Sequence, residues 1–218
     1  GFADFHFARF KVSAAFLNSG QTCSAHTRLL VPESKYAEAA KLAADEAQKF
    51  TLGDPMDEKT YIGPVARPAQ LAVLEAQVAD AQAKGGRVLC GGGRLDRPGF
   101  YFAPTVVIDA THQMDLMREE TFGPLIGIQR VAGDAEALGL MNDTEYGLTA
   151  SVFSADRDRA ARVLAQVNAG SVYWNCCDRV SPRLPWSGRG HSGLGSTLGL
   201  AGIRAFVQPK AWHLRTPR

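Results

Sequence analysis

Segments rich in β-branched residues alternate with segments of helical periodicity along most of the chain, and this alternation limits its possible folds most strongly. Short apolar runs bounded by Gly, Pro or Asp predict strands, whereas apolar residues spaced three and four apart predict amphipathic helices. The predicted strands cover residues 27–31, 87–90, 105–108, 126–131, 149–153 and 171–174. The predicted helices cover residues 34–50, 68–81, 134–141 and 157–167. This order predicts an α/β fold with a largely parallel sheet flanked by helices.

The two ends of the chain extend this pattern. Apolar residues from Phe5 to Phe16 fall at helical spacing, and Asp4 can cap that helix. A start this close to a helix cap leads us to expect a further segment upstream. Residues 198–206 predict a last helix and residues 211–214 a last strand. A length of 218 residues allows one large domain or two small ones, and we interpret the pattern as one.

Composition excludes several classes of protein. With 45% hydrophobic and 21% charged residues, the chain has an ordinary globular composition. No apolar run approaches the roughly 20 residues that cross a bilayer, and no signal peptide is recognisable, so we predict a cytoplasmic protein without a membrane segment. A net charge of +2 gives no reason to expect nucleic acid. Residues 179–218 contain seven Arg and Lys residues and no acid, which predicts packing on an acidic surface.

The four cysteines predict thiols rather than disulfides or a metal site. Cys176 and Cys177 are adjacent, so they do not easily form an ordinary disulfide with each other. They also lack the spacing of a Cys-x-x-Cys metal site, and no histidine pair follows at ligand spacing. We therefore predict no metal.

The first candidate for chemistry is Cys23, in the small polar segment NSGQTCSA (residues 18–25) between a predicted helix and a strand. Backbone amides around such a sulfur can lower its pKa and stabilise an oxyanion. The same residue type is equally suited to be a small packed side chain, so both interpretations stay open. His26 could act as a base for Cys23, which would make the protein a cysteine hydrolase or acyltransferase.

Two further segments invite a ligand interpretation. Residues 119–124 (EETFGP) place two acids beside an aromatic ring, and carboxylates can accept hydrogen bonds from ribose hydroxyls. Such acids are also common on solvated loops. Residues 188–193 match the dinucleotide pattern GxGxxG, but no strand directly precedes them and no acid follows. We therefore expect this loop to pack against another backbone.

Taken together, the segments resemble the aldehyde dehydrogenase superfamily. They occur in the family's order and at its spacing, and cover almost the whole chain. The matching segments are residues 16–25 (FLNSGQTCSA), 119–124 (EETFGP), 142–153 (NDTEYGLTASVF), 170–175 (GSVYWN) and 184–195 (LPWSGRGHSGLG). The resemblance implies the family's catalytic domain over residues 1–206, followed by a strand or tail of the oligomerisation type at 207–218.

The resemblance also implies the roles of individual residues. Cys23 is the nucleophile, Glu120 binds the nicotinamide ribose, and Phe122 contacts the nicotinamide side of NAD or NADP. Thr22, Ser24 and Trp186 belong to the pocket for a small-molecule aldehyde, and Trp186 stands where many relatives have Phe. The resemblance implies a homodimer or homotetramer.

The resemblance also implies that parts of the family's active site are not contained in these 218 residues. The family's cofactor domain, its general-base glutamate and the asparagine of its oxyanion hole precede the cysteine by more than the 22 residues present here. We therefore expect the 218-residue chain to be inactive by itself. Alternatives are a non-catalytic assembly fragment and an enzyme that passes its thioester to coenzyme A.

Overall fold

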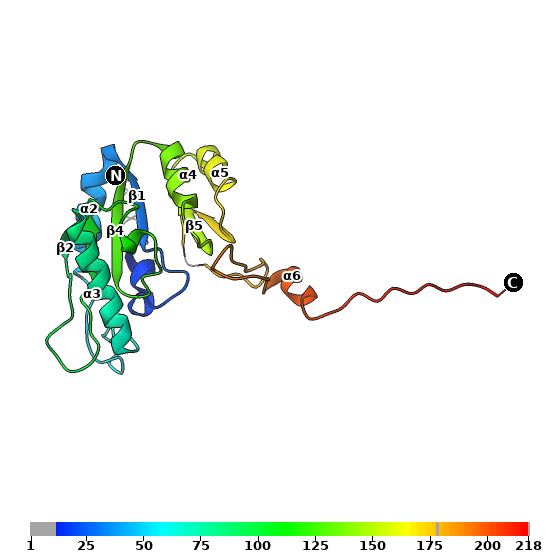
Figure 1. Cartoon of the computed structure of the whole chain (residues 1–218), viewed down its shortest axis with the longest axis horizontal. Coiled ribbons are helices and arrows are strands. Elements are labelled where there is room, and N and C mark those ends of the chain that lie inside the picture. The colour runs from blue at the N-terminus through cyan, green and yellow to red at the C-terminus, as the bar shows by residue number, and fades with distance from the viewer. Residues whose placement is uncertain (1–11, 178, 218) are drawn as a thin grey trace.

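The computed structural model describes residues 12–177 and 179–217, whose strands form two sheets flanked by helices (Figure 1). The strands are β1 (Arg28–Pro32), β2 (Arg87–Cys90), β3 (Thr105–Ile108), β4 (Leu125–Val131), β5 (Thr149–Val152) and β6 (Ser171–Trp174). The α-helices are α2 (Glu33–Ala47), α3 (Pro68–Ala83), α4 (Asp134–Asn142), α5 (Arg157–Leu164) and α6 (Gly199–Arg204), with short 3-10 segments η1 (Leu17–Gly20) and η2 (Asp115–Met117).

The larger sheet has the strand order β1-β4-β3-β2, and the smaller one pairs β5 with β6. Strand β4 runs parallel to both β1 and β3, β5 runs parallel to β6, and only β2 is antiparallel to its neighbour. All four residues of β3 are buried, as expected for a strand covered on both faces. The predicted α/β fold with a largely parallel sheet is confirmed.

Side chains of the central strands β3 and β4 alternate between two layers of the hydrophobic core. Ile126 and Ile128 pack in the cluster that contains the alanine-rich face of α2, whereas Leu125 packs in the cluster of α3. On β3, Val106 packs in the cluster of α2 and Val107 in the cluster of α3. Because successive side chains of a strand point to opposite faces, α2 and α3 must cover opposite faces of the larger sheet.

Most predicted boundaries agree with the structure within one or two residues, and three helices, α2, α5 and α6, are shorter than predicted. Helix α2 ends at Ala47 rather than at residue 50, because Phe50 leaves the helical path and stacks on Tyr61 with ring centroids 4.3 Å apart. Helix α5 ends at Leu164, three residues before the predicted end.

The structure tests only part of the predictions for the two ends of the chain. Residues 12–16 are helical, and Val12 and Phe16 are fully buried, while the predicted cap at Asp4 and residues 5–11 lie outside the described residues. Residues 207–217 extend away from the body after α6 (Figure 1). The strand predicted over residues 211–214 is not formed within this chain. No helix in the described part combines the length and apolarity needed to cross a bilayer.

A polar cluster around Asp109 connects three elements of the larger sheet layer. Its carboxylate accepts a 2.8 Å hydrogen bond from Arg87 Nε on β2 and lies 3.0 Å from Arg130 Nη2 on β4. Its backbone N–H donates to the Tyr36 hydroxyl of α2 over 2.6 Å. The hydrogen bond from Arg87, helped by the charge of Arg130, holds the pKa of the Asp109 carboxyl below its ordinary value.

We expect Asp109→Asn to lower the free energy of unfolding by about 1 kcal/mol at neutral pH, since both arginines are partly solvated. A carboxyl whose pKa is lowered by folding stabilises the protein above its unfolded pKa, and that contribution disappears as the pH falls through the folded pKa. The difference between the two proteins in urea titrations should therefore shrink steadily below about pH 4.

Asp45→Asn is the matched control, because Asp45 forms only an exposed ion pair with Lys41 on α2. Its effect should stay below about 0.5 kcal/mol. A constant difference between wild type and Asp109→Asn down to pH 2 would contradict the electrostatic role of Asp109.

Candidate functional site

Cys23 is exposed in the turn that leads into β1, and neighbouring side chains hold this turn in place. The Ser19 hydroxyl donates to the carbonyl oxygen of Gly63 over 3.0 Å, and Gln21 Oε1 accepts from the backbone N–H of Ala66 over 2.8 Å. The turn is therefore attached to residues 63–66, far from it in the sequence. It presents a fixed, accessible thiol.

Gly20 brings this turn into contact with the second candidate segment. Its φ is +74°, and a Cβ atom there would overlap the carbonyl oxygen of Gly123. Only glycine permits both this backbone conformation and this close approach. The backbones of residues 18–25 and 119–124 therefore touch directly.

The segment from Glu119 to Pro124 turns its acidic and aromatic side chains outward. Thr121 is buried, and its carbonyl oxygen accepts a 2.7 Å hydrogen bond from Gln70 Nε2 of α3. Glu119 and Glu120 are exposed on one side of this anchor, and Phe122 follows it with 36% of its surface exposed and φ of +47°. The two carboxylates and the ring are therefore accessible from solvent.

Tyr146 reaches the same acidic pair from the connection before β5. Burial, together with the charges of Glu119 and Glu120, raises the pKa of the Tyr146 phenol. Its ring meets the ring of His191 edge-on, with centroids 5.9 Å apart. Tyr146 therefore lies between the acidic segment and the glycine-rich loop that carries His191.

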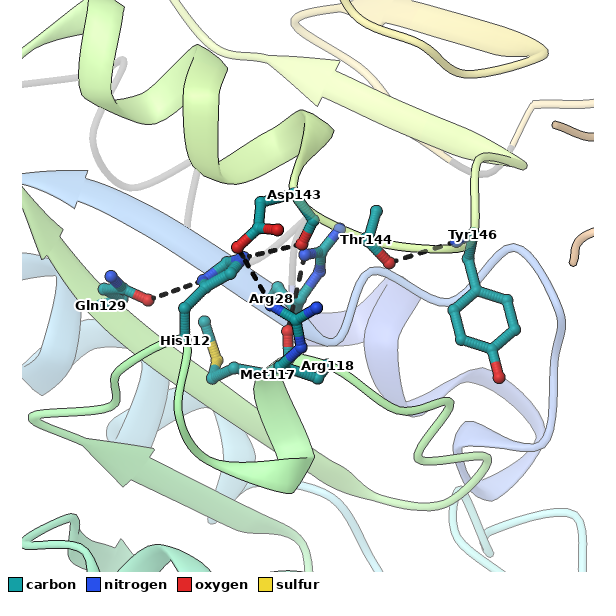
Figure 2. A network of polar contacts seen from close by, with 8 residues as sticks. All are labelled: Arg28, His112, Met117, Arg118, Gln129, Asp143, Thr144 and Tyr146. Atoms are coloured by element: carbon teal, nitrogen blue, oxygen red, sulfur yellow. Dashed lines mark hydrogen bonds and ion pairs between the residues drawn. The ribbon is translucent and has the colours of Figure 1, made fainter. Parts of the chain in front are cut away.

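A network of polar contacts connects the two sheets behind these residues (Figure 2). The Arg118 guanidinium lies 3.0 Å from the Asp143 carboxylate, and His112 bridges the Asp143 carbonyl oxygen at 3.2 Å and Gln129 Oε1 at 3.1 Å. Arg28 donates to the Met117 carbonyl oxygen over 3.5 Å.

This network fixes the end of η2, which Glu119 and Glu120 follow, and the connection after α4, which contains Tyr146. Burial and the neighbouring charge of Arg118 lower the pKa of Arg28, and the charge of Asp143 opposes that shift. The negative charge of Asp143 therefore offsets the repulsion between the guanidinium groups of Arg28 and Arg118.

The glycine-rich loop of residues 188–195 packs against the backbone that leads into β5. His191 N–H donates to the Glu145 carbonyl oxygen over 2.8 Å, and Ser192 Oγ accepts from the N–H of Gly147 over 3.0 Å. A Cβ atom at Gly190 would overlap the carbonyl oxygen of Glu145. As predicted, the loop packs on another backbone.

One cavity of about 1010 Å³ collects part of the predicted site. Cys23, Glu119, Glu120, Tyr146 and His191 line it. Thr22, Ser24, Phe122 and Trp186 do not belong to its lining. The structure therefore brings the predicted nucleophile and the predicted ribose-binding acid to one cavity and leaves the other four predicted residues off its wall.

Three of these four residues have other surroundings. The Thr22 hydroxyl donates to the Leu17 carbonyl oxygen over 3.2 Å, Trp186 and Thr197 exchange backbone hydrogen bonds of 2.7 and 2.9 Å, and Ser24 is buried. Their assignment to an aldehyde pocket stays a prediction.

His26 also lines the cavity, with Nε2 3.5 Å from the Ser151 hydroxyl and its ring edge-on to that of Tyr173. Within the described residues, no three His, Cys, Asp or Glu side chains gather as a metal site would require. None of the four cysteines forms a disulfide.

Comparison with known proteins identifies the family. The sequence model of the aldehyde dehydrogenase family matches residues 4–212, almost the whole chain. The chain belongs to the aldehyde dehydrogenase family. Betaine aldehyde dehydrogenase of Cereibacter sphaeroides is 39% identical over 200 residues, which make up 91% of this chain and 41% of that protein. The chain thus spans about two fifths of the length of the curated aldehyde dehydrogenases it matches.

Solved aldehyde dehydrogenases have the same fold. Aldehyde dehydrogenase C of Pseudomonas syringae, solved with NAD+ and octanal, matches with a TM-score of 0.88 at 36% identity. This match covers 94% of this chain and 43% of that enzyme. Betaine aldehyde dehydrogenase of Staphylococcus aureus, solved with NAD+, matches with a TM-score of 0.89 at 31% identity. This match covers 93% of this chain and 41% of that enzyme. These likenesses agree with the fold described above.

Three residues around the candidate site escaped the sequence analysis. Asp143 was visible as a polar member of the matching segment 142–153, and Arg118 directly precedes the segment EETFGP. His112 gave no signal, because its contacts to Gln129 and Asp143 depend on residues that only the fold brings together.

We expect Gly20→Ala to destabilise the fold by about 3 kcal/mol or more, because left-handed strain adds to the overlap with the Gly123 carbonyl. Gly85→Ala provides the control: Gly85 has φ of +93°, but nothing lies within 4 Å of its Cβ position. That variant should lose only about 1 kcal/mol. Urea titrations measure both values, and equal losses would show that the contact between the two segments contributes nothing.

Proposed function

We propose that this chain is the catalytic part of an NAD(P)-dependent aldehyde dehydrogenase that oxidises an aldehyde to a carboxylic acid through Cys23. One observation carries the proposal: the exposed Cys23 thiol and the Glu120 carboxylate line the same cavity. Family membership supports it, as does a solved relative with NAD+ and octanal bound.

Cys23 is proposed to supply the covalent chemistry. Its thiolate adds to the aldehyde carbon and forms a thiohemiacetal, whose oxyanion would be stabilised by the backbone N–H of Cys23. A bound nicotinamide supplies the hydride acceptor that turns such an adduct into a thioester. Water then hydrolyses the thioester on Cys23 and releases the acid.

Glu120 and Phe122 suit the proposed cofactor. Glu120 is exposed and can accept hydrogen bonds from vicinal ribose hydroxyls, while Phe122 offers an exposed ring for a flat heterocycle. Tyr146 lies beside both acids and would hold Glu120 near its position. Thr22, Ser24 and Trp186 remain the proposed surroundings of the aldehyde.

The assembly and location of the protein are also proposals. A homodimer or homotetramer in the cytoplasm would cover the exposed apolar side chains of residues 207–217, among them Trp212 and Leu214.

Stoichiometric acylation tests the nucleophile directly. With 4-nitrophenyl acetate, the Cys23 thiolate should displace 4-nitrophenolate and keep the acetyl group as a thioester, releasing about one equivalent of dye per chain. The variant Cys23→Ala should lose the rapid release. Cys90→Ala should keep it, because the Cys90 thiol is half-buried and burial raises its pKa.

The same measurement separates the alternatives. Equal dye release by wild type and Cys23→Ala would contradict a nucleophilic Cys23 and favour a non-catalytic assembly fragment. Continuous turnover that His26→Ala abolishes would instead indicate a cysteine hydrolase.

NADH formation tests the complete reaction. Joined to the part of the Cereibacter sphaeroides relative that it does not match, this chain should form NADH from betaine aldehyde or octanal, and Cys23→Ala should lower the rate at least about a thousandfold. The 218-residue chain alone should form none, because the cofactor domain implied by the family resemblance is not part of it. Aldehyde-dependent NADH formation by this chain alone would contradict that expectation.

A further inference from the structure

Two adjacent acids at the candidate site have different surroundings. Glu119 and Glu120 are both exposed, and both line the cavity. The Glu119 carboxylate accepts a hydrogen bond from the Tyr146 hydroxyl, whereas Glu120 acts on that hydroxyl through its charge. The acid proposed to bind ribose is therefore the neighbour of an acid that Tyr146 holds.

The backbone on both sides of Glu120 is fixed. The N–H of Glu119 donates to the Asp115 carbonyl oxygen over 2.8 Å, at the beginning of η2. On the other side, the buried Thr121 accepts a 2.7 Å hydrogen bond from Gln70 Nε2 at its carbonyl oxygen. With the backbone held at both neighbours, the position of the Glu120 carboxylate is set by its side-chain torsions. Ordering such a flexible side chain costs conformational entropy.

Tyr146 is a rigid donor. The backbone groups on both sides of it bind the glycine-rich loop, through the Glu145 carbonyl oxygen and the Gly147 N–H. Its ring also meets the ring of His191 edge-on at 5.9 Å. Burial and the surrounding acids raise the pKa of the Tyr146 phenol, so the hydroxyl keeps its proton at neutral pH and remains a donor.

Arg118 is engaged by another acid rather than by this pair. It directly precedes Glu119, and a guanidinium pairs readily with carboxylates. The Arg118 guanidinium lies 3.0 Å from the Asp143 carboxylate, and in Figure 2 the Tyr146 ring extends away from this ion pair. The charges of Glu119 and Glu120 therefore remain for the Tyr146 hydroxyl and for a ligand.

We propose that Tyr146 and Glu119 are positioning residues for Glu120. The Tyr146 hydroxyl holds the Glu119 carboxylate in one place. Repulsion between the two like charges then favours the Glu120 orientations that point away from Glu119, toward the ribose hydroxyls of a nicotinamide nucleotide. The inference rests on the proposed cofactor role of Glu120 and assigns a separate role to its neighbour and to Tyr146.

Ultraviolet titration of tyrosinate tests the contact in the 218-residue chain. Subtracting the titration of a Tyr146→Phe variant isolates the Tyr146 phenol in each background. Because Glu119 acts through a hydrogen bond as well as through charge, Glu119→Gln should lower the pKa of Tyr146 more than Glu120→Gln does.

Binding of nicotinamide riboside tests the positioning role. This probe carries the ribose hydroxyls and the flat ring that Glu120 and Phe122 are proposed to meet, and calorimetry or ligand-observed NMR measures its Kd. Tyr146→Phe should raise the Kd by roughly fivefold, because the Glu120 carboxylate is no longer ordered before the ligand binds. In the Glu120→Gln background, Tyr146→Phe should cause no further change.

Tyr101→Phe is the matched control. It also removes a tyrosine hydroxyl that donates to a carbonyl oxygen, that of Gly53 over 3.0 Å, but Tyr101 does not line the cavity. Its Kd for nicotinamide riboside should equal that of the wild type. Urea titrations of both variants show whether a change in Kd reflects general destabilisation.

Four outcomes would overturn the inference. Wild type and Tyr146→Phe bind the probe equally well, or Glu119→Gln leaves the pKa of Tyr146 unchanged. A loss of affinity that persists in the Glu120→Gln background would show that Tyr146 contacts the ligand itself. Absence of binding to the wild type would remove the cofactor role of Glu120 as well, whereas the dye-release test of Cys23 is independent of all four.

Discussion

The close approach of Gly20 to Gly123 is the contact on which the arrangement of the site depends. It sets the turn of Cys23 directly against the segment of Glu120 and Phe122, with no side chain between the two backbones. Each segment is separately anchored, the first through Gln21 to Ala66 and the second through Thr121 to α3. A larger residue at position 20 would separate two rigid bodies rather than move one flexible loop.

The two sheets are connected by polar side chains near the site. Near the site, Arg118 and His112 contact Asp143 and so connect η2 and β4 to the segment before β5. Among the described residues, β1 and β5 belong to separate sheets, and both strands line the cavity. Polar side chains near the site therefore align the two sheets.

Sequence patterns predicted the elements well because their causes are local. The apolar runs of β3 and β4 and the alanine-rich face of α2 identify buried surfaces without knowledge of their partners. Contacts between distant segments left no such signal, as the backbone bridge between Trp186 and Thr197 and the approach of Gly20 to Gly123 show. The strand predicted over residues 211–214 stays a prediction, since a strand requires a partner and the described residues place none beside it.

The direction of the strands explains why the site residues converge. Cys23, Glu120 and Tyr146 each lie just before a strand, namely β1, β4 and β5. Because β1 and β4 are parallel and β5 runs in the same direction, these three segments meet at the amino-terminal edge of the sheets. Open α/β sheets usually bind ligands at the carboxyl ends of their strands. The candidate site therefore lies at the edge opposite to the one that such sheets usually use, and its residues come from the segments that lead into the strands rather than from those that leave them.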